Sequence, residues 1–147
     1  MSAREDLVDD GRCIACGPQS TIGLKMTFES TADKSVSGRV TVEQRFQGWR
    51  GVVHGGVVAM LLDETMAYAA GAHGVVGVTG EMKMRFRDAV PIGEPLVLRG
   101  NVVWRRRNVL GIEASVSDDS GRLLASGTGS FVARGTLEPG TRFAQLN

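Results

Sequence analysis

The chain has 147 residues, of which 42% are hydrophobic and 22% charged, as in a single soluble globular domain. Its net charge is +1 at pH 7, so it lacks the basic excess of nucleic-acid-binding proteins. The first ten residues, MSAREDLVDD, are polar and acidic, and acidic residues or glycines interrupt the longest apolar runs. We therefore expect one cytoplasmic domain over residues 1–147, without a signal peptide, a membrane span or a nucleic-acid partner.

Both cysteines, Cys13 and Cys16, lie in the sequence CIACG near the start of the chain. One pair cannot supply the four ligands of a zinc site within one chain. A redox CxxC normally follows a strand in a strand–helix–strand pattern, which is missing here. Simple packing of an N-terminal segment over residues 1–21 is the first interpretation, and we expect no metal. A metal site between subunits and a redox pair remain as alternatives.

Hydrophobic and polar residues alternate with period two along most of the chain, which predicts β-strands. Residues 24–29 and 36–43, joined by the polar turn STADKS, predict a hairpin. Four more strands are expected to meander after position 80, with turns at AVPIGEP, RRRN and DDSG. The tail over 134–147 lacks this pattern, so we place the core of the domain at about 22–133.

Residues 55–72, GGVVAMLLDETMAYAAGA, predict one long helix because they are rich in Ala, Leu and Met and contain no proline. Nearly every side of this helix is apolar, so it should be buried on most sides. One helix must then cover one face of an antiparallel sheet. We expect an α+β fold in which a curved sheet of about five to six strands wraps around the central helix.

Two features of this helix suggest chemistry. Asp63 and Glu64 interrupt its apolar sequence, and a buried carboxylate without a partner costs several kcal/mol, so each needs a local partner or a function. His54, Gly55 and Gly56 stand at its start, where unpaired N–H groups and the helix dipole favour an oxyanion, and glycines let a ligand approach the backbone. Each feature also has a purely structural explanation. One of the two acids could be exposed or ion-paired, the glycines could form a tight turn, and His54 could be bonded to the backbone.

The distance along the helix adds a prediction about assembly. Gly55 and Asp63 are eight residues apart, which is about 12 Å at about 1.5 Å per residue. One carbonyl group of a substrate cannot easily touch both residues of one chain. If both act on one substrate, they come from two subunits whose helices run antiparallel across a two-fold axis.

The spacing from the His-Gly-Gly turn to Asp63 resembles that of the hotdog-fold acyl-CoA thioesterases of the phenylacetate-pathway type. The similarity extends to the CxxCG start, to VTGEMKMRFRDAVPIGEPL and to DDSGRLLASGTGSF, and so to most of residues 13–133. It implies hydrolysis of an acyl-CoA to the free acid and CoA by a homodimer or tetramer. No cofactor is expected, because coenzyme A is part of the substrate.

The resemblance also implies roles for individual residues. Asp63 matches the family's general base or nucleophile, the Gly55 amide its oxyanion donor, and His54 its turn histidine. Thr79 matches a hydroxyl residue that orients the attacking water. Gly48 stands where some members have an Asn that polarises the carbonyl, which is a departure from the family.

Further residues are candidates for binding the substrate. Basic side chains of this family often hold the phosphates of coenzyme A, and here they group on one strand and at one turn. Glu64 is the rival of Asp63, since adjacent helix positions point about 100° apart and only one can face the reaction centre. The residues expected to contact substrate are Gly48, Gly56, Glu64, Arg85, Arg87 and Arg106.

Two other functions fit parts of this pattern. A hotdog hydratase or dehydratase would use a histidine and an acid at a different spacing, which is not found here. A non-catalytic module that binds acyl-CoA or acyl-carrier protein would not need an acid at Asp63. The identity of the acyl group is outside what the residues indicate.

Overall fold

The computed structural model describes residues 7–136, which form one long helix, one short 3-10 helix and six strands. The helix spans the predicted residues, and the α+β fold predicted from the sequence is confirmed. The elements are β1 (Thr27–Ser30), β2 (Val36–Thr41), η1 (Gln44–Phe46), α1 (Gly55–Ala72), β3 (Val75–Phe86), β4 (Pro95–Arg106), β5 (Val109–Asp118) and β6 (Leu123–Thr136). No helix in this part of the chain is long and apolar enough to cross a membrane.

The six strands form a single antiparallel sheet with the order β1-β2-β4-β5-β6-β3. The hairpin predicted from 24–29 and 36–43 is present as β1 and β2. The four strands after the helix do not meander as predicted, because β3 pairs with β6 at the far edge and only β4, β5 and β6 follow one another. Residues 134–136, predicted to begin a loose tail, continue β6 beside the start of β3; the remainder of that tail lies outside the described residues.

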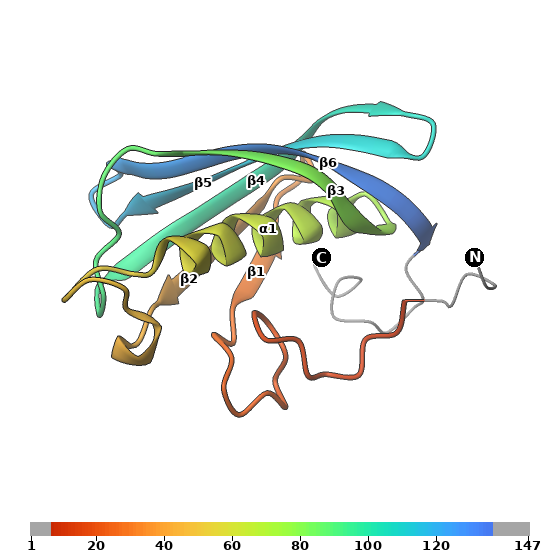
Figure 1. Cartoon of the computed structure of the whole chain (residues 1–147). Coiled ribbons are helices and arrows are strands. Elements are labelled where there is room, and N and C mark those ends of the chain that lie inside the picture. The colour runs from red at the N-terminus through yellow and green to blue at the C-terminus, as the bar shows by residue number, and fades with distance from the viewer. Residues whose placement is uncertain (1–6, 137–147) are drawn as a thin grey trace.

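The sheet curves around α1, which lies along its concave face (Figure 1). Leu61, Leu62 and Met66 of the helix are completely buried, as are Leu96 and Leu98 of β4. The hydrophobic residues of the two layers thus form one core, as the apolar character of the helix predicted. This packing fixes the position of every side chain on α1.

A glycine sets the approach of the helix to the middle of the sheet. A Cβ atom at Gly100 of β4 would lie 2.9 Å from the Cγ2 of Thr65. The hydroxyl of Thr65 is turned back to the Leu61 carbonyl, at 2.6 Å, so this buried polar group is satisfied within the helix. The absence of a side chain at Gly100 therefore allows α1 to seat closely on β4.

The segment before β1 covers the other side of α1 (Figure 1). Its backbone is held by hydrogen bonds from Leu24 N to Ile14 O and from Met26 N to Ala15 O, both 2.9 Å. Ala15 and Cys16 are buried in the core cluster. The helix is thus enclosed between the sheet and the N-terminal segment, as expected for a helix that is apolar on nearly every side.

Candidate active site

His54 caps the N-terminus of α1 and fixes the turn that enters the helix. Its backbone N–H donates to the Phe46 carbonyl at 3.0 Å, and its Nδ1 accepts from the Gly56 N–H at 2.9 Å. An imidazole whose Nδ1 accepts a hydrogen bond carries its proton on Nε2 in the neutral form. The side chain therefore satisfies one unpaired helix amide and presents an N–H donor on its other edge.

The amide of Gly55 is the first of the helix. Within the described chain it makes no hydrogen bond, and a Cβ atom built at Gly55 would meet no atom within 4 Å. The positive end of the helix dipole lies at this amide. The site can thus donate a hydrogen bond to an oxygen that becomes negatively charged, which is what acyl transfer requires.

A cleft of about 630 Å³ opens at this end of the helix. Among the predicted site residues it brings together Gly48, His54, Gly55 and Arg87. Apolar side chains form most of the wall, and Arg87 adds a cationic group, so the cleft suits a ligand with an apolar part and an anionic part. The full lining is Gly48, Trp49, Val52, Val53, His54, Gly55, Val58, Phe86, Arg87, Asp88, Ala89 and Val90.

Gly48, where part of the family has Asn, lies directly against the capping histidine. A Cβ atom at this position would lie 3.2 Å from the Cα of His54 and 3.5 Å from its Cδ2. A side chain at Gly48 would therefore crowd the turn in this chain. Its N–H donates to Val52 O at 2.9 Å, which closes the loop before the helix.

Asp63 pairs with Thr79 on the adjacent edge strand. The Thr79 hydroxyl donates to Oδ1 of Asp63 at 2.5 Å. Asp63 is partly buried on α1, whereas Thr79 is exposed on β3. The contact holds the carboxylate in one orientation at the side of the sheet where β3 has no neighbouring strand.

The two groups predicted to act together do not meet within one chain. Neither Asp63 nor Thr79 lines the cleft that contains Gly55. The eight residues between Gly55 and Asp63 correspond to about 12 Å of helix. Within one chain, the Asp63–Thr79 pair and the cleft at Gly55 therefore lie at separate places along β3.

Glu64 faces away from both of these places. Its side chain is 8% exposed, and its Oε1 lies 3.7 Å from the Sγ of Cys13. Burial, followed by the negative charge of Glu64, raises the pKa of the Cys16 thiol above its ordinary value. The structure therefore places Glu64 with the two cysteines, not among the residues that line the cleft.

The predicted arginines are spread over three places. Arg87 lines the cleft at Gly55, and together with Arg85 it also lines a second hollow of about 550 Å³ across strands β3 to β6. Arg106 lies with its neighbours at the turn between β4 and β5. Of these three, Arg87 is the one that the fold brings to the helix terminus.

Two aromatic residues of the cleft were not predicted. Trp49 is 85% exposed and Phe86 is 52% exposed, although both line the cleft wall. The sequence signal for Trp49 was its place in GWRG, six residues before the amide at Gly55. Large apolar groups exposed beside a cleft are suited to contact with a ligand or another subunit.

Comparisons with known proteins agree on one family. Residues 50–125, just over half of the chain, match the family described as the Thioesterase superfamily. Acyl-coenzyme A thioesterase 13 of Mus musculus is 26% identical over 106 residues, which cover 70% of this chain and 76% of the mouse protein. A solved thioesterase superfamily protein is 29% identical, covers 90% of this chain and 72% of its own, and superposes with a TM-score of 0.78.

Two more distant structures share the fold. A hypothetical thioesterase of Streptococcus pneumoniae, solved with coenzyme A, is 20% identical with a TM-score of 0.72, over 77% of this chain and 91% of its own. The PaaI protein of the E. coli phenylacetic acid degradation operon is 18% identical with a TM-score of 0.71, over 77% and 82% of the two chains. The curved sheet around one helix is therefore shared well beyond detectable sequence identity.

Proposed function

The chain belongs to the thioesterase superfamily, and from this premise we propose that it hydrolyses an acyl-CoA to the free acid and CoA. Membership confirms the resemblance to hotdog thioesterases drawn from the sequence. The observation that carries the proposal is the pair of half-sites along β3, an oriented carboxylate at Asp63 and an unpaired helix amide at Gly55. A carboxylate to activate water and a donor to hold an oxyanion are the two groups that thioester hydrolysis needs.

Pairing of two chains through β3 would join the half-sites. Among the strands of residues 7–136, this 12-residue strand is an edge of the sheet, so its outer side has no partner strand there. A two-fold axis near Lys83 would set Thr79 of one chain opposite Phe86 of the other, because the bulge between Thr79 and Glu81 leaves both positions three ladder steps from Lys83. Asp63 beside Thr79 would then face the cleft of the partner, which contains Gly55.

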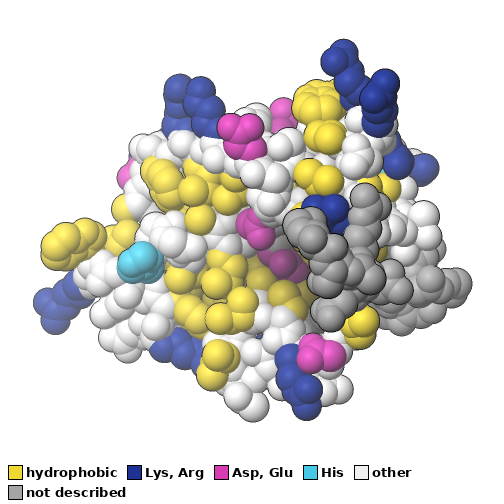
Figure 2. Space-filling model, turned by 45° about the vertical axis from the view of Figure 1, so that its right-hand side comes forward, with side chains coloured by type: hydrophobic (Ala, Val, Ile, Leu, Met, Phe, Trp, Pro, Cys, Tyr) yellow, Lys and Arg dark blue, Asp and Glu magenta, His cyan; other side chains and the backbone are white. Residues whose placement is uncertain are grey.

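The exposed apolar groups at this edge support such pairing. Val78 and Phe86 of β3 are 38% and 52% exposed, and Trp49 stands beside Phe86 in the cleft wall. One face of the molecule carries a broad area of hydrophobic side chains, with acidic side chains recessed near its middle (Figure 2). A second copy of the chain would remove apolar surface of this kind from water.

In the proposed reaction, Asp63 takes a proton from a water molecule that Thr79 helps to orient. The water oxygen attacks the thioester carbon, and the carbonyl oxygen becomes an oxyanion that accepts a hydrogen bond from the Gly55 amide of the partner chain. The C–S bond then breaks, the acid is released, and the proton passes to the CoA thiolate. Direct attack by the Asp63 carboxylate, giving an anhydride that water hydrolyses, uses the same groups. Neither route uses a metal or a redox cofactor.

The cleft supports an acyl-CoA as the substrate class. Trp49, Val52 and Phe86 would contact the apolar part of the substrate, and Arg87 would bind a phosphate of coenzyme A. The mouse relative is an acyl-coenzyme A thioesterase by name, and the pneumococcal structure contains coenzyme A. These two proteins support the assignment of the thiol half of the substrate.

The test is thiol release from a panel of aromatic, short-chain and medium-chain acyl-CoAs. We expect wild-type activity on at least one class and a loss of about 100-fold or more in Asp63→Asn. Asp119→Asn, an exposed acid at the far turn that pairs with Arg39, is the matched control and should keep full activity. Equal rates for wild type and Asp63→Asn would refute the role of Asp63. A wild type that binds CoA esters and cleaves none would instead be a binding module.

A further inference from the structure

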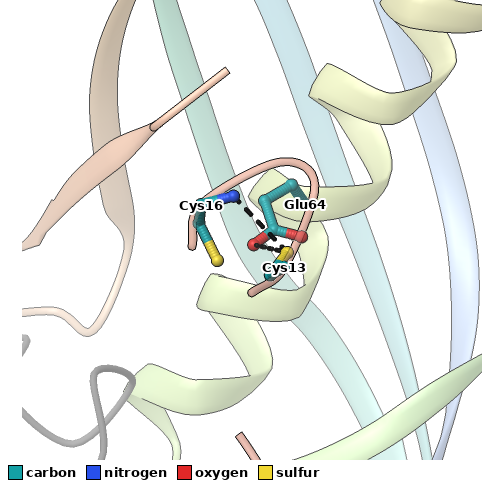
Figure 3. A group of neighbouring side chains, drawn as sticks. All are labelled: Cys13, Cys16 and Glu64. Carbon is teal, nitrogen blue, oxygen red and sulfur yellow. Dashed lines mark hydrogen bonds between the residues drawn. The ribbon is translucent and has the colours of Figure 1, made fainter. Parts of the chain in front are cut away.

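Three side chains that the proposed reaction does not use converge between the N-terminal segment and α1. Cys13, Cys16 and Glu64 point toward one another (Figure 3). Their sulfur and carboxylate oxygen atoms all lie within 4.8 Å of each other. We propose that this cluster binds one Zn²⁺ ion, which fastens the N-terminal segment to the helix that carries Asp63.

The spacing of Cys13 and Glu64 is close to what zinc requires. Tetrahedral zinc with bonds of about 2.3 Å to sulfur and about 2.1 Å to oxygen separates those two ligand atoms by about 3.6 Å. The Sγ of Cys13 lies 3.7 Å from Oε1 of Glu64. Adjustments of a few tenths of an ångström would suffice to bring these two atoms to the coordinating distance.

The backbone between the cysteines is already folded around the first sulfur. The N–H groups of Ala15 and Cys16 donate to Cys13 Sγ at 3.3 and 3.4 Å, and Gly17 N donates to Cys13 O at 2.8 Å. A Cβ atom at Gly17 would lie 2.4 Å from Cys13 N, so a glycine is needed to close this turn. These hydrogen bonds hold the Cys13 sulfur in one position on the N-terminal loop, beside Glu64.

The chemistry of the three groups selects a divalent, thiophilic ion. Deprotonated, Cys13, Cys16 and Glu64 would carry three negative charges in a partly buried cluster, and a divalent cation would offset most of that charge. Thiolate ligands favour Zn²⁺ over Mg²⁺ or Ca²⁺, which prefer sites made of oxygen. The two cysteines supply two ligands and Glu64 supplies a third. The second carboxylate oxygen of Glu64 or a water molecule would be the fourth ligand.

The position of the cluster gives the ion a defined role. Glu64 follows Asp63 directly on α1. An ion bound to Glu64 and to the cysteines of the N-terminal segment would therefore hold the helix backbone next to Asp63. The role is structural, because neither cysteine lines the cleft at Gly55. The proposal is independent of the reaction and stands or falls on metal binding alone.

The first test is metal binding to the full chain, reduced and freed of metal by a chelator. We expect one Zn²⁺ per chain by elemental analysis, and Co²⁺ should give the thiolate charge-transfer band and the strong visible bands of tetrahedral coordination. Cys13→Ser and Cys16→Ser should lose both signals, and Glu64→Gln should bind about tenfold more weakly or worse. Glu113→Gln, an exposed acid on β5, is the matched control. Substoichiometric metal without a charge-transfer band, or unchanged binding in both serine variants, would overturn the proposal.

The second test needs no variant that could fail to fold. Zn²⁺ should raise the melting temperature of the wild-type chain, and a chelator should reverse the increase. Asp63→Asn should show the same zinc response, so loss of hydrolysis and loss of metal binding are separate results. A wild-type melting temperature that is insensitive to both Zn²⁺ and chelator would contradict a fastening role for the ion.

Discussion

The Thr79 hydroxyl lies 2.5 Å from Oδ1 of Asp63 and joins the edge strand β3 to the middle of α1. The bond fixes the carboxylate at the open edge of the sheet, where a second chain would pair. Among residues 7–136, no side chain donates a hydrogen bond to Oδ2, which would be open to accept one from water. In the proposed reaction, this contact would give Thr79 an orienting role toward Asp63.

Thr79→Val removes the hydroxyl and keeps the shape of the side chain. A hydrogen bond to a charged group contributes about 1.5–3 kcal/mol, so we expect kcat for acyl-CoA hydrolysis to fall by about tenfold or more. KM should change little, since the lost hydrogen bond orients Asp63 and is not a contact with the acyl-CoA. Thr79→Ser keeps the donor and should restore most of the rate; a Thr79→Val enzyme as fast as wild type would rule out the orienting role.

Gly55→Pro removes the candidate oxyanion donor with little structural change. Gly55 is the first helical residue, where proline fits, and His54 before it has ψ 135°, the extended conformation that a residue before proline adopts. A Cβ atom also has open space there. We expect kcat to fall by about 100- to 1000-fold, the usual cost of losing one oxyanion donor.

The control for that variant is Gly55→Ala, which adds a methyl group and keeps the N–H. It should lose far less activity than Gly55→Pro in the same thiol-release assay. Matching circular dichroism spectra and melting temperatures would show that the helix is intact in both. Similar rates for the proline and alanine variants would mean that the amide is not the oxyanion donor.

Asp118 makes the stability of the last hairpin depend on pH. Its Oδ1 accepts from the Ser120 hydroxyl at 2.7 Å and from the N–H groups of Ser120 and Arg122 at 3.0 and 2.9 Å. The Ser120 hydroxyl and then these backbone donors lower the pKa of Asp118 below its usual value. A carboxylate with a lowered folded-state pKa stabilises the protein above its unfolded pKa, and the contribution is lost as pH falls through the folded pKa.

Asp118→Asn should therefore melt at a lower temperature than wild type at neutral pH. The difference should shrink as the pH falls below the unfolded-state pKa of about 4 and then through the lowered pKa of Asp118 in the folded protein. Melting curves from neutral to acidic pH measure this directly. A gap between the two proteins that stays constant across the range would show that the charge of Asp118 contributes nothing.

Local patterns predicted the elements of this fold but not the place of every strand. The limits of α1 follow from an uninterrupted apolar sequence between a His-Gly-Gly start and a glycine-rich end. The position of β3 beside β6 cannot be predicted from a local pattern, because strand pairing depends on contacts between residues far apart in the chain. Likewise, the shift in register between Val102 and Trp104 leaves the indole of Trp104 half-exposed, which strict alternation could not predict.

In the candidate site, too, some features could be predicted from the sequence and others could not. The spacing of His54 and Asp63 on one helix is visible in the sequence, and so is the distance that separates Gly55 from Asp63. The proximity of Glu64 to Cys13 is not visible in the sequence, since these residues are 51 positions apart and meet because the N-terminal loop folds over α1. Which arginine reaches the cleft also depends on the end of β3, not on the charge pattern alone.

The most direct measurement of the shared site is subunit complementation between Asp63→Asn and Gly55→Pro. If one reaction centre uses Asp63 of one chain and Gly55 of its partner, each mixed dimer contains one centre with both native groups. Random mixing of the two inactive proteins should then restore about a quarter of wild-type hydrolysis, because half of the dimers are mixed and each has one of two centres intact. A mixture no more active than its parents, with mixed dimers shown to form, would contradict the shared site.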